Sequence, residues 1–274
     1  MPSDSTIQLP VVKISANSSS SAIDTLAAEE PLEIRLEYCI DGRVTQKTIS
    51  VTMRTPGDDG ALAIGFLFTE GIISGKDDLE VKQPVDKNII TLSIKPAVEI
   101  NIKKLERHFY TSSSCGVCGK TSIDAIKTVC QLAATTNDLK YPVGLIQQLP
   151  EKLRRQQDIF EQTGGLHASA LFNAAGELIL LREDVGRHNA LDKLIGSALI
   201  GDKLPLNEHI LLLSGRISFE LVQKAAMAGI KVIAAIGAPS SLAVETAAAF
   251  GMTLIGFLRG QRFNIYSGAQ RIVI

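Results

Sequence analysis

Short apolar strands alternate with helical segments over the last third of the chain, and this order leaves few folds open. Apolar runs predict strands at 209–215, 231–237 and 253–260. Residues 218–229 and 240–251 lie between them with helical spacing, and each segment begins at a serine and ends at a glycine, as helix caps do. A strand–helix–strand–helix–strand order is typical of an α/β sheet with crossover helices. The C-terminal part is therefore predicted to be an α/β domain.

The first part of the chain follows a different pattern. Apolar and polar residues alternate over 32–40 and 43–53, on either side of an Asp41-Gly42 turn, which predicts a β-hairpin. One helix is expected over Ala61–Thr69 and another over 146–161.

These patterns divide the chain into three parts. Residues 1–28 are rich in serine and are expected to form a flexible tail with little to bury. Residues 29–110 are expected to form a smaller, hairpin-rich α+β unit. Residues 111–274 are expected to form the α/β main domain.

The charges of the chain nearly balance, with 28 Lys and Arg against 29 Asp and Glu. This balance gives no global electrostatic attraction to nucleic acid or to an acidic membrane, so neither is expected as a partner. No stretch reaches the roughly 18 unbroken apolar residues of a membrane helix. The N-terminus lacks the basic and apolar regions of a secretory signal, so we expect a cytoplasmic protein.

Two cysteines, Cys115 and Cys118, stand three positions apart among serines and glycines, directly before a predicted helix. The helix N-terminus and Lys120 favour the thiolate form, which nucleophilic sulfur chemistry requires. Sulfur handling is favoured, but a structural zinc site, a thioredoxin-like redox pair and two ordinary loop cysteines stay open. Zinc needs further ligands, and the remaining candidates form no second pair: Cys39, Cys130 and His167. A redox pair is expected after the first strand of a βαβ unit rather than after hairpins.

Residues 118–121 (CGKT) end like the phosphate-binding loop of an NTPase. The first glycine of that motif is required at position 114, which is serine. We therefore reject an NTPase.

Polar segments that contain glycine or serine follow three predicted strands, at 183–193, 214–216 and 238–241. Strand ends followed by helix N-termini are where α/β proteins bind anions, so these segments suggest a pocket for a phosphorylated ligand at one edge of the sheet. Residues 257–262 (FLRGQR) add two arginines, which can bind phosphates through paired hydrogen bonds. His167 follows two glycines closely, but a histidine in an apolar segment is more often structural.

Seven motifs in this order resemble the FdhD family: RTPGDD, EGII, SSSCGVCGK, TGGLHA, EDVGRHNALDK, SGRISFE and APSSLAVE. The resemblance runs from about residue 30 to the C-terminus. It implies a sulfurtransferase accessory protein that is required for formate dehydrogenase activity. Such a protein takes persulfide sulfur from a cysteine desulfurase and passes it to the bis-guanine-dinucleotide form of the molybdenum cofactor, for apo-formate dehydrogenase. The resemblance also implies a homodimer whose α/β main domain is cytidine-deaminase-like.

The resemblance assigns roles to particular residues. Cys115 is implied to be the persulfide carrier and Cys118 its partner. The guanine-nucleotide site, which GDP-like nucleotides can occupy, is implied at Phe257, Leu258, Arg259, Gly260, Gln261 and Arg262. Together with the polar segments described above, we expect the cofactor to contact His167, Arg187, His188, Ser214, Arg216 and Ser240. No bound metal of the protein itself is expected.

One other function stays open, and a further one is considered and not expected. The chain could be a non-enzymatic chaperone that binds the molybdenum cofactor, with thiols that only protect the metal centre. A zinc-dependent nucleotide deaminase would need a glutamate two positions after the histidine and a CxxC pair later in the chain. Position 169 is serine and the CxxC pair precedes His167, so deaminase chemistry is not expected even if the fold is shared.

Overall fold

The computed structural model describes residues 5–40, 42–82, 86–95, 98 and 139–274 of the chain. Its largest sheet has six strands in the order β13-β12-β11-β10-β8-β9. The bounds of these strands are β8 (His167–Phe172), β9 (Leu178–Asp184), β10 (Ile210–Leu213), β11 (Val232–Ala235), β12 (Thr253–Arg259) and β13 (Arg262–Ser267). Strands β10, β11 and β12 run parallel, whereas β8 and β13 run antiparallel to their neighbours. All residues of β10 and β11 are buried, as expected for central parallel strands covered on both faces. The predicted α/β arrangement is confirmed.

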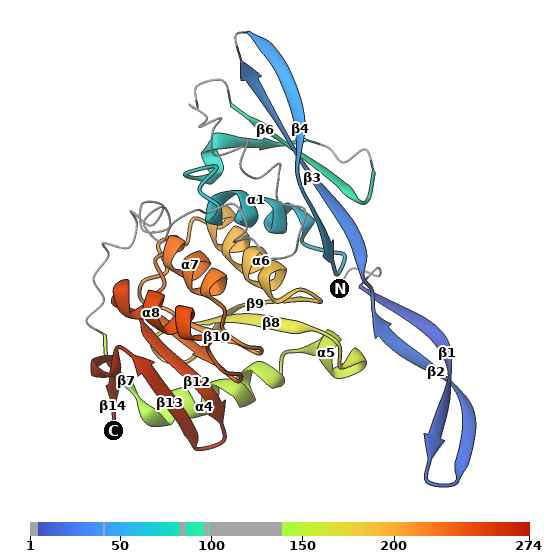
Figure 1. The fold of residues 1–274 in the computed structure, drawn as a ribbon, viewed down its shortest axis with the longest axis vertical. Coiled ribbons are helices and arrows are strands. Elements are labelled where there is room, and N and C mark those ends of the chain that lie inside the picture. Colours follow the sequence, from blue (N-terminus) through green and yellow to red (C-terminus); the bar gives the residue numbers. More distant parts are fainter. Residues whose placement is uncertain (1–4, 41, 83–85, 96–97, 99–138) are drawn as a thin grey trace.

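Helices cover both faces of this sheet (Figure 1). One face carries α6 (Arg187–Ile200), α7 (Phe219–Met227) and α8 (Ser241–Ala249). The other face carries α4 (Val143–Arg154) and α5 (Asp158–Thr163). Sequence analysis predicts one continuous helix over 146–161. The structure breaks it after Arg154, because Gln157 leaves helical geometry and the backbone N–H of Phe160 donates to the carboxylate of Glu183.

The N-terminal unit contains a four-stranded sheet in the order β4-β3-β6-β5. The strands are β3 (Glu30–Ile40), β4 (Arg43–Arg54), β5 (Leu79–Val81) and β6 (Ile89–Ile94), and helix α1 (Asp59–Thr69) follows β4. Alternate residues of β3 are buried, which is the pattern that the sequence predicts for a strand with one face on a core. The predicted β3–β4 hairpin and the helix after it are confirmed.

Helix α1 crosses α6 at very short range, and glycines make the crossing possible. A Cβ atom on Gly65 of α1 would lie 1.9 Å from the carbonyl oxygen of Asp192, and one on Gly196 of α6 would lie 1.9 Å from that of Ala61. A single hydrophobic core therefore continues from the N-terminal sheet, through α1 and α6, into the six-stranded sheet. The expected boundary near residue 110 lies outside the described residues and stays a prediction, but the parts on either side share one core.

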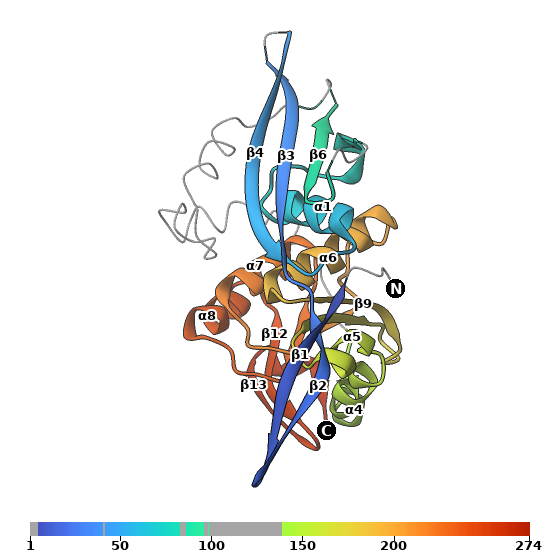
Figure 2. The same ribbon diagram turned by 90° about the vertical axis from the view of Figure 1, so that its right-hand side faces the viewer.

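Residues 6–27 form an antiparallel hairpin of β1 (Thr6–Ser15) and β2 (Ser18–Ala27), which projects from the rest of the molecule (Figures 1 and 2). This corrects the expectation of a structureless tail. The segment is paired along its whole length because ten residues on each side of the Ala16-Asn17 turn can form a complete ladder. It still buries little, and Val12, Ile14 and Ile23 are exposed.

The remaining elements are short. Strands β7 (Tyr141–Pro142) and β14 (Ile272–Val273) pair in parallel, and 3₁₀ turns cover Lys76–Asp78 and Ala269–Arg271. Among the helices of the described residues, none has the length and apolarity needed to cross a membrane.

Candidate functional site

The strand directions bring the predicted polar segments to one edge of the large sheet. Because β8 runs antiparallel to both β9 and β10, the first residue of β8 lies at the same edge as the last residues of β9, β10, β11 and β12. Helices α6, α7 and α8 begin at this edge. The segments that follow β9, β10 and β11 therefore lie side by side, as the sequence predicts.

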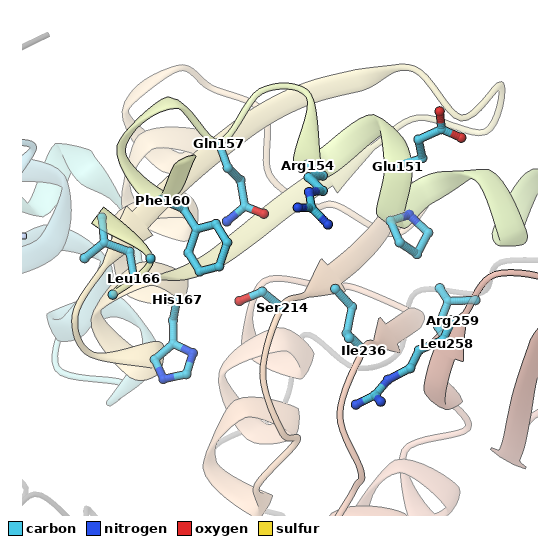
Figure 3. Close-up of a pocket in the computed structure, with 13 residues that line it drawn as sticks. Glu151, Arg154, Gln157, Phe160, Leu166, His167, Ser214, Ile236, Leu258 and Arg259 are labelled. Carbon is cyan, nitrogen blue, oxygen red and sulfur yellow. The ribbon is translucent and has the colours of Figure 1, made fainter. Parts of the chain in front are cut away.

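A cavity of about 840 Å³ lies at this edge, between the strand ends and the α4–α5 layer (Figure 3). A volume of this size is typical of small-molecule sites. The cavity is lined by Pro150, Glu151, Arg154, Gln157, Phe160, Gly164, Gly165, Leu166, His167, Ser214, Ile236, Leu258 and Arg259.

Four of the residues predicted to bind the cofactor line this cavity: His167, Ser214, Leu258 and Arg259. The hydroxyl oxygen of Ser214 accepts a 2.8 Å hydrogen bond from the backbone N–H of Ala168, so it joins the ends of β8 and β10. Burial, with the positive charges of Arg187 and Arg216, lowers the pKa of His167, while the carboxylate of Asp184 acts in the opposite direction. His167 is therefore neutral at neutral pH and offers a hydrogen bond rather than a charge.

The rest of the FLRGQR segment does not line the cavity. Gly260 and Gln261 form the turn between β12 and β13, and Arg259 and Arg262 face each other across the ladder. Phe257 has a left-handed backbone conformation, with φ of 54°, and its side chain is 43% exposed. The carbonyl oxygen of Gln261 accepts a 2.7 Å hydrogen bond from Gln147, which ties this hairpin to α4.

The other four predicted residues lie at the same edge outside the cavity lining. Ser240 caps α8, because its hydroxyl accepts a hydrogen bond from the backbone N–H of Ala243. His188 directs Nε2 toward the hydroxyl of Ser218 at 3.2 Å and the carboxylate of Glu220 at 3.0 Å. In a hydrolase triad the serine and the carboxylate contact different nitrogens of the histidine ring. Here Ser218 and Glu220 both contact Nε2 of His188, so these three residues do not form such a triad. Arg187 and Arg216 are the last two of these four residues, and both lie close enough to His167 to lower its pKa.

Two arginines, Arg154 and Arg259, and one glutamate, Glu151, line the cavity. Within the described residues, neither Arg154 nor Arg259 forms an ion pair, whereas the neighbouring Arg155 pairs with Glu151. Phe160, Leu166, Ile236 and Leu258 supply an apolar wall. Unpaired guanidinium groups beside an aromatic and aliphatic surface suit a ligand that joins a flat ring to phosphate.

Comparison with known proteins bears on this arrangement. Residues 27–273 match the family model described as the FdhD/NarQ family. The chain belongs to the FdhD/NarQ family. The sulfur carrier protein FdhD of Streptomyces coelicolor is 49% identical to it, across 96% of this chain and 94% of that protein. The sulfur carrier protein FdhD of Mycobacterium tuberculosis is 44% identical across 94% and 95%, and that of Saccharolobus solfataricus is 42% identical across 96% of each.

A solved structure has the same fold as this FdhD/NarQ protein. The crystal structure of a protein from Desulfotalea psychrophila, described as a formate dehydrogenase accessory protein, matches with a TM-score of 0.72 and 25% identity. The match covers 98% of this chain and 99% of that one. A mixed α/β fold with N-terminal hairpin sheets and a larger mixed sheet is thereby confirmed. The finer likeness to cytidine deaminases stays a prediction.

The α4–α5 wall of this FdhD/NarQ cavity was not predicted from the sequence. Arg154, Gln157 and Phe160 follow one another at intervals of three residues, which would place them on one side of the predicted helix 146–161. That spacing was the available signal. No recognised motif covers these residues, and their spacing alone does not predict that they lie at the strand ends.

Part of the densely charged segment 183–193 of this FdhD/NarQ protein is buried and holds the fold together. The carboxylate of Asp184 is fully buried, 2.7 Å from the ammonium of Lys193. Asp192, also buried, accepts 2.9 Å hydrogen bonds from Lys224 and from Thr69 of α1. Burial and pairing of these carboxylates and ammonium groups make them part of the core of the protein.

A second family motif, RTPGDD, also holds the fold together. Arg54 is almost fully buried and forms two hydrogen bonds to the carboxylate of Asp59, at 2.9 and 3.0 Å. The next residue, Thr55, contacts the Asp184–Lys193 pair through its backbone. These two motifs therefore meet at the junction between the N-terminal unit and the large sheet.

The predicted nucleophile lies outside the described residues, as do Cys118 and Cys130. Cys39 is exposed on β3, far along the sequence from the cavity residues. In the part of the chain that the structure describes, no three metal-binding side chains cluster together. The roles predicted for Cys115 and Cys118, the zinc alternative included, therefore stay predictions.

Proposed function

We propose that this chain is a sulfur carrier that takes persulfide sulfur from a cysteine desulfurase and delivers it to the bis-guanine-dinucleotide molybdenum cofactor, for use by formate dehydrogenase. The observation that carries the proposal is similarity over almost the whole chain to proteins named as sulfur carriers. A cytoplasmic homodimer that meets both the desulfurase and apo-formate dehydrogenase belongs to the same proposal.

The cavity supports the binding half of this function. Its volume suits one nucleotide arm of the cofactor, with the ring against the apolar wall and the phosphates near Arg259. Arg187 and Arg216 extend the positive charge along the edge where α6 and α7 begin. The cofactor is cargo here, so the protein needs to hold it and release it.

The thiol pair accounts for the chemical half. The thiolate of Cys115 attacks the terminal sulfur of the desulfurase persulfide, a new S–S bond forms on Cys115, and the desulfurase cysteine leaves as a thiolate. The thiolate of Cys118 or of an external thiol then attacks Sγ of Cys115. A disulfide forms, and the terminal sulfur leaves as hydrosulfide, which is delivered to the molybdenum centre. The two electrons that reduce the sulfur come from the pair of thiols.

Replacing Cys115 by alanine should abolish sulfur loading, because the proposal makes its thiolate the group that accepts sulfur from the desulfurase. The protein is incubated with a cysteine desulfurase and cysteine, and the peptide that contains position 115 is measured by mass spectrometry. The wild-type peptide should gain one sulfur atom, and the variant peptide none. Cys39→Ala, which removes an exposed thiol on β3, should load like the wild type. If Cys115→Ala still matures formate dehydrogenase normally, Cys115 is not the nucleophile. If the wild-type peptide gains no sulfur, the chain acts as a cofactor-binding chaperone instead.

Replacing Arg259 by alanine should weaken GDP binding by about 10- to 100-fold, because a charge-assisted hydrogen bond of about 1.5–3 kcal/mol is lost. Arg43→Ala is the control, since Arg43 is exposed on β4 and does not line the cavity. Its effect should stay below about threefold. Calorimetric titration of both variants with GDP measures the difference, and equal losses would place the nucleotide outside the cavity.

A further inference from the structure

Helices α7 and α8 both begin at a serine at the strand-end edge, but only one of the two serines caps its helix. The hydroxyl of Ser240 accepts a hydrogen bond from the backbone N–H of Ala243, which is the usual role at this position. Ser218 occupies the same position of α7 and forms no such bond. Its hydroxyl instead donates to the carboxylate of Glu220 at 3.0 Å. Local rules of this kind are broken mainly at functional sites.

The hydroxyl proton of Ser218 fixes the tautomer of His188. Because that proton is directed to Glu220, the hydroxyl oxygen can only accept from the histidine ring. An ionised carboxylate also only accepts. Nε2 of His188 lies 3.2 Å from the hydroxyl and 3.0 Å from the carboxylate, so it must carry a hydrogen. In the neutral ring the other nitrogen, Nδ1, then has the free electron pair.

Nδ1 of His188 can exchange a proton with a ligand or with water. Within the described residues it has no hydrogen-bond partner, and the buried ring nitrogen that lacks one belongs to His209 instead. The His188 side chain is 23% exposed. When Nδ1 takes up a proton, the carboxylate of Glu220 at Nε2 balances the charge that the ring gains. A carboxylate that orients an imidazole and leaves one nitrogen open is an arrangement used in general acid–base catalysis.

His167 lies at the same edge, but its surroundings oppose a positive charge. Burial and the charges of Arg187 and Arg216 lower the pKa of His167. No carboxylate in the described part of the chain forms an ion pair with it, whereas His188 is paired with Glu220. Of these two histidines, His188 is therefore the one whose contacts suit it to accept and return a proton.

We propose that His188 is the proton-transfer group of the sulfur-carrier reaction, and that Ser218 and Glu220 are positioning residues that act through it. The inference rests on the proposed function, because a cofactor held at the strand-end edge brings the reacting sulfur to the start of α6 and α7. Nδ1 accepts the proton of the attacking thiol, and the sulfur of that thiol forms a disulfide with Sγ of Cys115. The persulfide S–S bond breaks, and its terminal sulfur leaves as hydrosulfide. The two thiol sulfurs supply the two electrons, and the imidazolium returns its proton to the solvent.

The test is the release of hydrosulfide in a single turnover. The full chain is loaded with sulfur by a cysteine desulfurase and cysteine, and release is started with excess dithiothreitol. His188→Gln keeps a side-chain N–H for Glu220 and Ser218 but cannot exchange a proton, so release should slow by about 100-fold or more, the usual contribution of a general acid–base group. His209→Gln is the matched control and should release sulfur like the wild type, since His209 lies at the opposite end of β10.

Two further readouts separate proton transfer from a structural role. The pH profile of release by the wild type should contain an ionisation that His188→Gln lacks. The charged or titratable groups around the ring are Glu220 of α7, Arg187 of α6, Arg216 of the β10–α7 segment and His167 of β8. The two arginines stay charged throughout and give no ionisation of their own. Added imidazole should restore release to His188→Ala and leave the wild type unchanged, because it replaces a missing proton acceptor.

The outcomes separate this inference from the proposed function. Equal release by His188→Gln and the wild type overturns the inference, as does slow release with neither the change in pH profile nor rescue by imidazole. If the His188 variants do not fold, Ser218→Ala, which removes no helix cap, should also slow release, and an unchanged rate overturns the inference. Failure of the desulfurase to load Cys115 contradicts the proposed function instead. The thiols are then loaded with inorganic polysulfide, and the dependence of release on His188 is measured in the same way.

Discussion

Replacing Gly65 by alanine should lower the free energy of unfolding by about 3 kcal/mol or more, at the upper end of what overpacking costs. The added methyl carbon would lie 1.9 Å from the carbonyl oxygen of Asp192 and 2.8 Å from its carbonyl carbon. Both atoms belong to the backbone of α6, so no side-chain rotation can relieve the clash. Helices α1 and α6 would have to separate, which would open the core they share.

Gly60 supplies the control for this experiment, because it lies in the same helix and a Cβ there would meet nothing within 4 Å. Gly60→Ala should stabilise the protein by about 0.5–1 kcal/mol, since alanine loses less conformational entropy in a helix. Urea denaturation followed by circular dichroism measures both variants. Similar stabilities for Gly65→Ala and Gly60→Ala would mean that the helix crossing is looser than described.

Replacing Asp184 by asparagine should lower the free energy of unfolding by about 3–5 kcal/mol, because it leaves the ammonium of Lys193 buried without a counter-charge. The two oxygens of Asp184 accept from Lys193, the backbone N–H of Thr55 and of Gly186, and the amide of Asn189. An asparagine can supply only one oxygen, and its NH₂ group would face donors.

Asp58→Asn is the matched control, because Asp58 forms an ion pair with Arg182 at 3.2 Å while its side chain is 52% exposed. Its backbone has a left-handed conformation, which asparagine tolerates as well as aspartate does. The loss should stay below about 1 kcal/mol, as for other exposed ion pairs. Chemical denaturation of the two variants under the same conditions checks the contrast. Equal losses of unfolding free energy in the two variants would show that the buried Asp184–Lys193 pair contributes no more to stability than the exposed Asp58–Arg182 pair.

Much of the fold could be predicted because its signals are local. The strands at β10, β11 and β12 are short apolar runs, and the helices between them carry serine and glycine at their ends, so neighbouring residues alone indicate the alternation. The hairpin of β1 and β2 was missed because its serines look like those of a disordered segment, whereas pairing depends on the register of the two strands.

The candidate site could be predicted only in part, because it is assembled from distant segments. His167, Ser214 and Arg259 follow from strand ends, which the sequence marks with polar residues. The opposite wall comes from a helix break that depends on Glu183, a residue 23 positions from Phe160. The buried pairing of Asp184 likewise depends on Thr55, which is 129 positions away. No local pattern distinguishes such a buried carboxylate from a solvated one.

The glycine crossing of α1 and α6 limits how such a chain can be rearranged. The N-terminal unit and the large-sheet domain cannot be exchanged independently. An N-terminal unit taken from a relative must place a glycine where Gly65 meets the backbone of α6. Chimeras between relatives will tolerate exchange of surface hairpins and turns more readily than exchange at this contact. Splitting the gene into separately expressed fragments would leave both helices with an uncovered apolar face.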